Sequence, residues 1–181
     1  MKDFDVAALS EALDARRREL GMTWQELAVQ VTDRPSRRSD RRIAASTFQG
    51  MSQRRSVKDT VVLQAVRWLG RTPESFVPGL GERPEHALPG VDAGRPALDT
   101  RAIYLAVNDQ RTARGLTWRD VADEIGPGVT AGMLTRLADG TGTGFPRVMR
   151  IFQWLERPVA EFTCFIHDDD DQADDDQAEV D

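Results

Sequence analysis

The sequence has few of the residues that build disulfides, metal sites and catalytic clusters. Its 181 residues include one cysteine, Cys164, and two histidines, His86 and His167. A single cysteine excludes an internal disulfide and a cysteine-based zinc cluster, and two histidines cannot supply a His-rich metal site or a triad. We therefore expect a non-enzymatic protein with no catalytic residue, no metal, no cofactor and no small-molecule substrate. Cys164 itself is expected to be a small buried residue.

Long apolar runs are also missing. No run approaches the roughly 18 residues that a membrane span needs, and no charged-then-apolar leader opens the chain. A lone cysteine is typical of a reducing compartment. We therefore expect a cytoplasmic protein with no membrane contact. The hydrophobic content of 40% is enough for a packed core.

Charge is unevenly distributed along the chain. The net charge is −6, but residues 168–181 hold 9 acidic residues and no basic one. Between residues 33 and 55, by contrast, there are seven arginines and two aspartates. The concentrated basic segment indicates a polyanionic partner, and the acidic end is typical of a solvated, disordered tail. The tail could instead compete with DNA for the arginines or contact another protein.

The chain contains two copies of one unit. At an offset of 94 residues, eight of the 28 positions in 4–31 are identical to their counterparts in 98–125, including a Gly-x-Thr-Trp that begins at Gly21. At an offset of 86 residues, 43–76 aligns with 129–162. A repeat of this kind predicts two copies of the same supersecondary structure.

An insertion and a linker divide the chain. The offset changes because the first copy has TDRPSRRSDRR where the second has GPG, which gives the first copy eight extra residues. Between the copies, residues 78–97 include four prolines and four glycines. This content of helix- and strand-breaking residues is expected to prevent both helix and strand there. The predicted parts are a first domain at 1–77 with an Arg-rich insertion at 32–42, a linker at 78–97, a second domain at 98–166 and an acidic tail at 167–181.

Apolar spacing predicts five short helices in each copy and no strand, so the predicted fold class is all-α. The helices are expected at 6–20, 23–31, 43–51, 62–69 and 73–76, and again at 103–114, from 117, and at 129–138, 146–155 and 159–162. Thr23 with Glu26, and Thr117 with Asp120, have the spacing of a capping box at the start of the second helix.

Six segments carry a resemblance to a known family. They are GMTWQELAVQV, IAASTFQGM and VVLQAVRWLGRTPESF in the first copy, and GLTWRDVADEIG, VTAGMLTRLADG and RIFQWLERPVAEF in the second. In order and spacing they resemble the Xre/Cro-repressor family of helix-turn-helix DNA-binding proteins. The resemblance covers about 135 of the 181 residues. It implies two tandem five-helix, lambda-repressor-like helix-turn-helix domains, although the insertion in the first copy departs from the family's tight turn.

The resemblance implies that the third helix of each copy lies in the major groove with its early residues toward the bases. The implied base contacts are Ala45, Ser46, Gln49, Thr130, Gly132, Thr135 and Arg136, and Ala44, Gly50 and Ala131 lie on the same faces. The guanidinium of Arg136 can pair with guanine O6 and N7, and the amide of Gln49 can pair with adenine. Arg136 could instead pair with Asp139. Because the copies present different residues, we expect an asymmetric target.

Phosphate contacts are expected from two groups of residues. The resemblance places the start of each second helix, with Trp24, Gln25, Trp118 and Arg119, beside a phosphate, helped by free N–H groups and the helix dipole. The two tryptophans could instead pack against the first helix. The second group is the arginines in and beside the insertion, which could alternatively enter a minor groove or stay solvated: Arg34, Arg37, Arg38, Arg41, Arg42, Arg54 and Arg55.

The expected function is sequence-specific binding of double-stranded DNA by a transcriptional regulator, most simply a repressor, and such a protein is expected to be nucleoid-associated. A flexible 20-residue linker has a typical span of about 25 Å and a limit of about 65 Å, which allows both copies to reach half-sites about 34 Å apart. The alternative keeps one copy as the DNA reader and makes the other a protein-interaction module, as in an antitoxin or a polymerase-binding accessory factor. Residues 91–167 hold 9 basic and 9 acidic residues, so electrostatics favours the first copy as the reader. A homodimer or another protein partner stays open.

Overall fold

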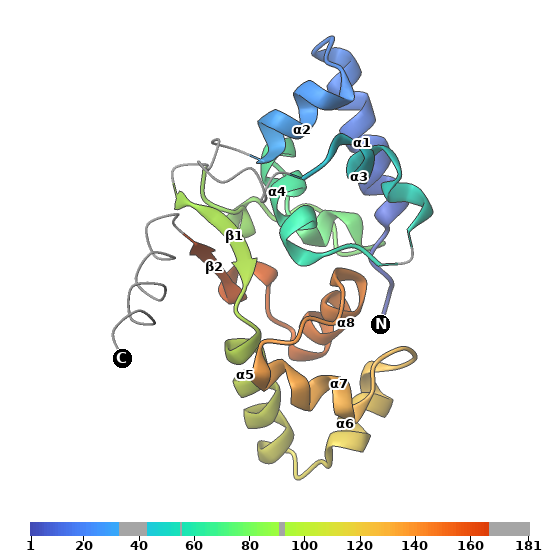
Figure 1. Ribbon diagram of the computed structural model, residues 1–181. Coiled ribbons are helices and arrows are strands. Elements are labelled where there is room, and N and C mark those ends of the chain that lie inside the picture. The colour runs from blue at the N-terminus through green and yellow to red at the C-terminus, as the bar shows by residue number, and fades with distance from the viewer. Residues whose placement is uncertain (33–42, 55, 91–92, 167–181) are drawn as a thin grey trace, which may run out of the picture.

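The chain folds mainly into helices. A computed structural model describes residues 1–32, 43–54, 56–90 and 93–166 (Figure 1). Within these ranges the chain also forms one small sheet of two strands, in addition to the helices. The mostly helical fold is compatible with the predicted all-α class, but the prediction that no strand forms is wrong.

The same succession of elements occurs twice. The N-terminal half, residues 1–77, contains α1 (Val6–Glu19), α2 (Trp24–Thr32), α3 (Ala45–Gln49), the 3-10 turn η2 (Met51–Gln53), α4 (Asp59–Leu69) and the 3-10 turn η3 (Pro73–Phe76). The C-terminal half, residues 98–166, contains α5 (Thr100–Ala113), α6 (Trp118–Ile125), α7 (Ala131–Arg136), η6 (Leu137–Asp139), α8 (Phe145–Leu155) and η7 (Val159–Phe162). Outside these series lie η4 (Pro84–His86), β1 (Arg95–Leu98) and β2 (Thr163–Ile166). The closing turns η3 and η7 have the bounds that the sequence predicts.

Local signals start the first helix of each half in the same way. A side-chain oxygen of Asp5 accepts a hydrogen bond from the backbone N–H of Ala8 at 2.8 Å, and Asp99 does the same for Ala102 at 2.8 Å. An aspartate in this position satisfies an N–H that has no partner within the helix. The two aspartates are equivalent at the 94-residue offset, so the repeat fixes both helix starts.

The proline- and glycine-rich segment between the halves is bonded to the N-terminal half. The carboxylate of Glu82 accepts from the backbone N–H of Thr72 at 2.8 Å, and the Arg67 guanidinium donates to the carbonyl oxygen of Gly94 at 2.7 Å. Leu80 and Leu88 are half-buried against the core. The segment is therefore fixed at several points along its length.

The end of this segment forms a strand, contrary to the prediction. β1 pairs antiparallel with β2, with Ala97 opposite Cys164 in the register. A short strand is stabilised by its partner and by packing, and the partner of β1 lies far along the chain, out of reach of local sequence patterns. Cys164 is exposed, so the prediction of a buried thiol is also wrong.

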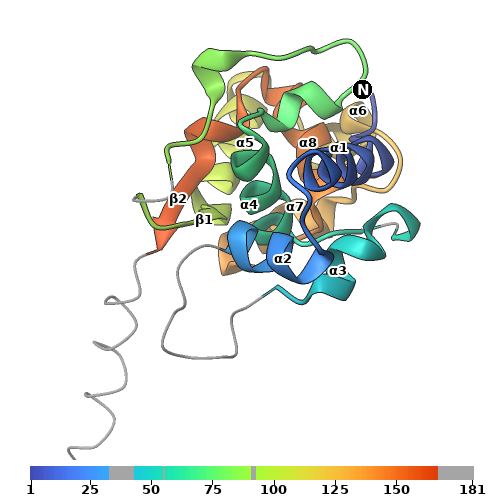
Figure 2. The ribbon, with the colours of Figure 1, turned by 90° about the horizontal axis from the view of Figure 1, so that it is seen from above.

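The two halves share one hydrophobic core, which contains buried residues from both. They lie against each other, with α8 of the C-terminal half beside the N-terminal half (Figures 1 and 2). The segment before α1, residues 1–5, forms an arm that crosses to α8. There the ring of Phe4 packs edge-on against the ring of Phe145, with 5.0 Å between the two ring centroids. The Gln153 side chain on α8 accepts from the backbone N–H of Lys2 at 2.9 Å and donates to the Lys2 carbonyl oxygen at 2.8 Å.

The exchange of arms is reciprocal. β1, the arm before α5, packs against α4 of the N-terminal half, and the Leu98 N–H donates to Asp59 at 3.4 Å. Backbone bonding adds a further link, because the N–H of Phe145 donates to the carbonyl oxygen of Val57 at 3.0 Å. The spacing of the halves is therefore set by packed contacts, and the freely extending linker of the sequence prediction does not describe it.

Candidate nucleic-acid interface

The short helix α3 divides into a buried and an exposed face. Phe48 and the following Met51 are fully buried, which fixes the helix against the core. Ser46 and Gln49 are exposed, as predicted for residues that approach bases, whereas Ala45 is half-buried against the core. Two of the three predicted base-contacting residues of this half are therefore fully accessible.

The equivalent helix α7 is divided in the same way. Leu134 and Leu137 are fully buried, and Gly132, Thr135 and Arg136 are exposed. A Cβ added at Gly132 would meet nothing within 4 Å, so the backbone here can be approached closely from outside. Thr130, also exposed, caps the helix by accepting from the Met133 N–H at 3.3 Å. The Arg136 guanidinium has no ion pair among the described residues, so the alternative pairing with Asp139 is not formed.

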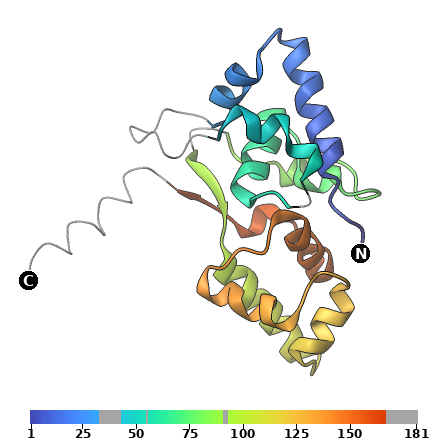
Figure 3. The same cartoon turned by 45° about the vertical axis from the view of Figure 1, so that its right-hand side comes forward.

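The helices α3 and α7 lie on one side of the molecule, the side toward the viewer in Figures 1 and 3. One comes from each half, and their polar faces are built from residues that differ between the copies. The arrangement offers two separate, accessible helix faces on a common scaffold.

The turns that lead into α3 and α7 differ. Between α6 and α7, Gly126 and Gly128 adopt positive φ angles of 101° and 88°, a backbone region that side chains other than glycine rarely enter. In the N-terminal half the backbone N–H of Ile43 donates to the Thr32 hydroxyl at 3.3 Å. Thr32 and Ile43, the described residues on either side of the insertion, are therefore in contact at the end of α2.

Most of the predicted phosphate contacts of the insertion lie outside the described residues. These are Arg34, Arg37, Arg38, Arg41, Arg42 and, just after η2, Arg55, and the acidic tail 167–181 also lies outside. Arg54 is described, is exposed and has no ion pair in the described part of the chain. Arg54 directly follows η2, the turn after α3, so an exposed arginine lies close to α3 in the sequence.

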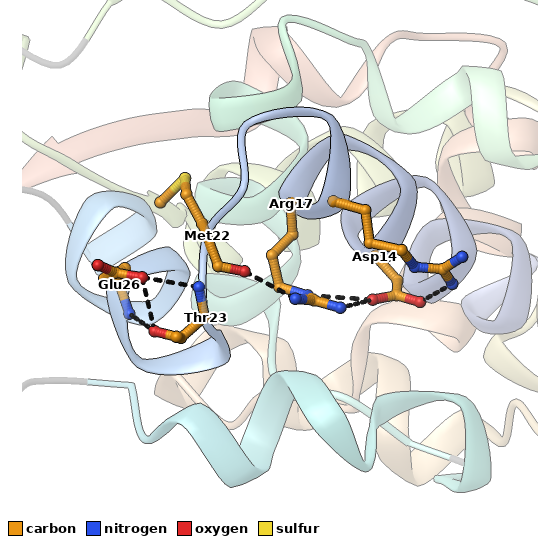
Figure 4. Close-up of polar contacts among 6 residues, drawn as sticks. Asp14, Arg17, Met22, Thr23 and Glu26 are labelled. Carbon is orange, nitrogen blue, oxygen red and sulfur yellow. Dashed lines mark hydrogen bonds and ion pairs between the residues drawn. The ribbon is translucent and has the colours of Figure 1, made fainter.

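An arginine in α1 ties the start of α2 to the first helix (Figure 4). The Arg17 guanidinium donates to Asp14 at 2.6 Å and to the carbonyl oxygen of Met22 at 2.7 Å, and it lies over the Trp24 ring at 4.8 Å from the centroid. The pKa of Asp14 is lowered by hydrogen bonds from Arg18 and Arg17. Half-buried Trp24 therefore packs against the arginine of α1, one of the two roles that the sequence leaves open.

The C-terminal half repeats this arrangement. The Arg111 guanidinium donates to Asn108 and to the carbonyl oxygen of Leu116, both at 2.8 Å, and lies over the Trp118 ring at 4.8 Å. Trp118 also stacks on Tyr104 at a centroid distance of 5.5 Å. Gln25 and Arg119, next to the two tryptophans, are exposed. Of the two residues predicted to contact a phosphate at each helix start, the exposed one is therefore the residue after the tryptophan.

Capping boxes already occupy part of the helix starts where phosphates were expected. The Thr23 N–H donates to Glu26 at 2.7 Å, and the Glu26 N–H donates to the Thr23 hydroxyl at 3.2 Å. The backbone and side-chain hydrogen bonds from Thr23 lower the pKa of Glu26. Thr117 and Asp120 form the same box, and the hydrogen bonds from Thr117 lower the pKa of Asp120. Two of the four free N–H groups at each helix start are therefore taken.

Sequence reasoning missed a basic hollow of about 820 Å³ where the two halves meet. Arg54 from the N-terminal half and Arg147 and Arg150 from α8 line it, beside the turn at Gly128. Arg150 is held in place, since it donates to Asp3 at 2.6 Å across the junction of the halves, whereas Arg147 is exposed. Only the packing of the halves brings Arg54 to the two arginines of α8, so no local pattern could have identified the hollow.

Comparison of the chain with known protein families, with curated proteins and with solved structures gives no match. Among the described residues, no group of three or more His, Cys, Asp or Glu residues is placed to hold a metal ion. No helix in the described ranges is both long and apolar enough to cross a membrane.

Proposed function

We propose that this protein binds double-stranded DNA in a sequence-specific way and represses transcription by occupying its target site. In this proposal α2 with α3, and α6 with α7, are two helix-turn-helix units, and α3 and α7 enter the major groove. The observation that carries the proposal is the pair of short helices on one side of the molecule, each anchored by buried apolar residues and each with an accessible polar face.

The chemistry of the two faces suits base recognition. Ser46 and Gly132 are small, so they let a helix approach base edges closely, and Gln49 and Arg136 supply the longer hydrogen-bonding groups. An unpaired guanidinium can bond guanine O6 and N7 together, and a glutamine amide can bond adenine N6 and N7. Since Gln49 and Arg136 come from different halves, they would read different parts of the site.

Electrostatics would supply the rest of the affinity. The basic hollow places Arg54 and Arg147 where the halves meet, beside the turn that leads into α7. Phosphate contacts of this kind position a protein on DNA without reading its sequence, and they weaken as salt rises. We add Arg147 to the residues expected to contact phosphates.

The reciprocal arms favour a fixed spacing of the two reading helices. Packed contacts between the halves, such as that of Phe4 with Phe145, would hold α3 and α7 at one separation. One chain would then act as a covalent pseudo-dimer whose two faces differ. We expect a two-part, asymmetric target with a single preferred spacing between its parts.

The test uses the full chain, because separated halves would expose the shared core. The protein is incubated with a random pool of duplex DNA, and the retained fragments are sequenced. We expect the retained fragments to share an asymmetric motif. Fluorescence anisotropy should show that Arg136→Ala binds this motif about tenfold to a hundredfold more weakly than the unchanged protein does. Arg101→Ala, on an exposed position of α5, removes the same charge outside the reading helices and should leave the affinity unchanged.

Two results would decide against this function. Failure of the intact chain to retain any DNA at low salt would exclude it. A motif lost in Gln49→Ala but unchanged in Arg136→Ala would instead support the alternative in which only the N-terminal half reads DNA and the other half binds a protein.

A further inference from the structure

The turn that leads into α7 is poorly suited to hold its shape by itself. Residues 126–128 are Gly-Pro-Gly, and both glycines have positive φ angles. Glycine loses more conformational freedom on folding than any other residue. The Val129 N–H donates across the turn to the carbonyl oxygen of Gly126 at 3.4 Å, which is longer than most hydrogen bonds of this kind. The orientation of α7 therefore depends on what packs against this turn.

Arg150, on α8, supplies such a contact. Its Nη1 atom donates to the carbonyl oxygen of Pro127 at 3.0 Å. The same atom lies close to Gly126, where an added Cβ would come within 3.4 Å of it. The side chain of Arg150 is only 13% exposed, so it is held between the elements that line the basic hollow. The middle of the turn is therefore bonded to α8.

The rest of the Arg150 guanidinium bonds to the N-terminal half. Its Nε donates to Oδ1 of Asp3 at 2.7 Å, and its Nη2 lies 2.6 Å from the same oxygen. Asp3 belongs to the arm before α1. Its neighbours in the arm, Lys2 and Phe4, are themselves fixed against α8. One planar group thus joins the arm of one half to the turn before α7 of the other half.

The first copy has no such bridge among the residues that the structure describes. At the 86-residue offset Arg150 corresponds to Gln64, whose amide donates within its own helix to the carbonyl oxygen of Thr60 at 3.1 Å. In place of the Gly-Pro-Gly turn the first copy has the insertion. An uncharged residue therefore fits the equivalent position of the helix, so the helical scaffold alone does not require an arginine at position 150.

We propose that Arg150 is a positioning residue for α7, and that it holds the turn before α7 in place only while the arm of the N-terminal half is docked on it. A guanidinium is planar and has donors on three nitrogens, so it can bond to the Asp3 carboxylate and to the Pro127 carbonyl oxygen at the same time. The carboxylate fixes the direction in which the remaining N–H groups point. The inference rests on the proposed function only where α7 is taken to read bases.

Amide hydrogen exchange in the full chain tests the bridge without DNA. The N–H groups of Val129, in the turn, and of Leu134, in α7, are the reporters. Asp3→Ala removes a 72% exposed carboxylate, so it should leave the fold intact, and Arg150→Gln introduces the residue of the first copy. In both variants the two reporters should exchange about threefold to tenfold faster. The N–H of Gly50, at the end of α3, should keep its rate.

A double variant separates a bridge from two independent contacts. If Asp3 acts through Arg150, Asp3→Ala should add nothing in the Arg150→Gln background. Glu161→Ala is the matched control, because it removes another ion pair of the C-terminal half, with Arg157 at 2.7 Å. This control should leave exchange at Leu134 unchanged.

A second measurement connects the bridge to DNA. Asp3→Ala makes the chain more basic, which by charge alone would strengthen binding to any DNA. We nevertheless expect it to relax selectivity at the positions of the selected site that Arg136→Ala affects, and not at those that Gln49→Ala affects. If the intact chain retains no DNA, the proposed function fails, and the exchange rates still decide whether the bridge holds α7.

Three results would overturn the proposal. Unchanged exchange at Val129 and Leu134 in both single variants would show that the turn does not need the bridge. Additive effects in the double variant would show that Asp3 does not act through Arg150. Equal acceleration at Gly50 and Leu134 would show a general loss of stability in place of a local role.

Discussion

The two halves of the molecule have the same scaffold and different surfaces. Arg17 and Arg111 make equivalent hydrogen bonds from the first helix of each half to the segment that leads into the second helix. Each half also caps its first two helices with equivalent side chains. The exposed residues of α3 and α7 have little in common, and the turns before them differ in length by eight residues. The residues that join the first two helices are therefore repeated in both halves, whereas the exposed residues of α3 and α7 are not. Such a pattern is expected when one fold is used twice to recognise two different things.

The ends of the halves differ for a local reason. After Phe162 the chain continues into β2 and pairs with β1. After Phe76 the equivalent position reaches Pro78, which has no N–H to donate to a ladder. The arm before α1 instead bonds to the Gln153 side chain on α8. The arm before α5 is thus held by a strand pair and by packing on α4, and the arm before α1 is held by a side-chain amide on α8.

The largest expected effect is on the shared core. Phe145→Ala removes a fully buried ring that packs on Phe4, and should lower the free energy of unfolding of the whole chain by about 3–5 kcal/mol. Guanidinium denaturation measures the loss, and hydrogen exchange should show lower protection in α4 as well as in α8. Leu105→Ala, at a 49% exposed site on α5, is the control and should change stability little. Loss of protection confined to α8 would mean that the halves fold independently.

The next effect concerns the difference between α3 and α7. Gln49→Ala and Arg136→Ala should each cost about 1–3 kcal/mol of DNA-binding free energy and relax selectivity at different positions of the selected site. Repeating the random-pool selection with each variant measures this. Loss of selectivity at the same position in both variants would contradict a separate reading role for each half.

A smaller effect tests the likeness of the capping boxes. Thr117→Ala and Thr23→Ala each remove a side chain that accepts from an N–H in the first turn, and should each lower the free energy of unfolding by about 1 kcal/mol. Thr→Ser at the same positions keeps the hydroxyl and is the control. Thermal melts of the four variants check the prediction, which fails if the alanine and serine variants melt alike.

The smallest effect is on pH dependence. The pKa of Glu26 lies below its ordinary value of 4.5 because of its bonds to Thr23, so its contribution to stability is fully present above about pH 4.5 and is lost as the pH falls below it. Asp120 behaves in the same way below its ordinary value of 3.8. Glu26→Gln and Asp120→Asn should therefore flatten the acid side of the curve of stability against pH. A steeper acid slope in the variants would contradict the assigned direction.

Local patterns predicted the helices well, and long-range features poorly. The capping boxes at Thr23 and Thr117 follow from residues three apart, and the buried positions Phe48 and Leu134 follow from helical spacing. The strand at Ala97 and the exposure of Cys164 were missed because both depend on a partner far along the chain. An accessible polar face on α3 and α7 could be predicted, because the apolar residues of each helix define its opposite side.

The sites at the junction of the halves could not be predicted. Arg147 and Arg54 line the same basic hollow only because the two halves pack together. The same holds for Glu74 and Met149, which line a cavity of about 470 Å³ between the halves. No spacing within either copy encodes these pairs. Glu74 itself has no counterpart in the repeat, since the equivalent position at the 86-residue offset is Ala160.

A duplicated helical unit can be predicted from the amino-acid sequence alone, because helix caps, apolar spacing and turn residues act over a few positions and are present twice. The crossing of the arms, the single core that joins both halves and the meeting of Arg54 with Arg147 in the basic hollow can be seen only in the folded chain. Burial and strand pairing depend on which residues far apart in the sequence come into contact, as does whether a polar atom finds a hydrogen-bond partner. Those contacts form only when the whole chain packs.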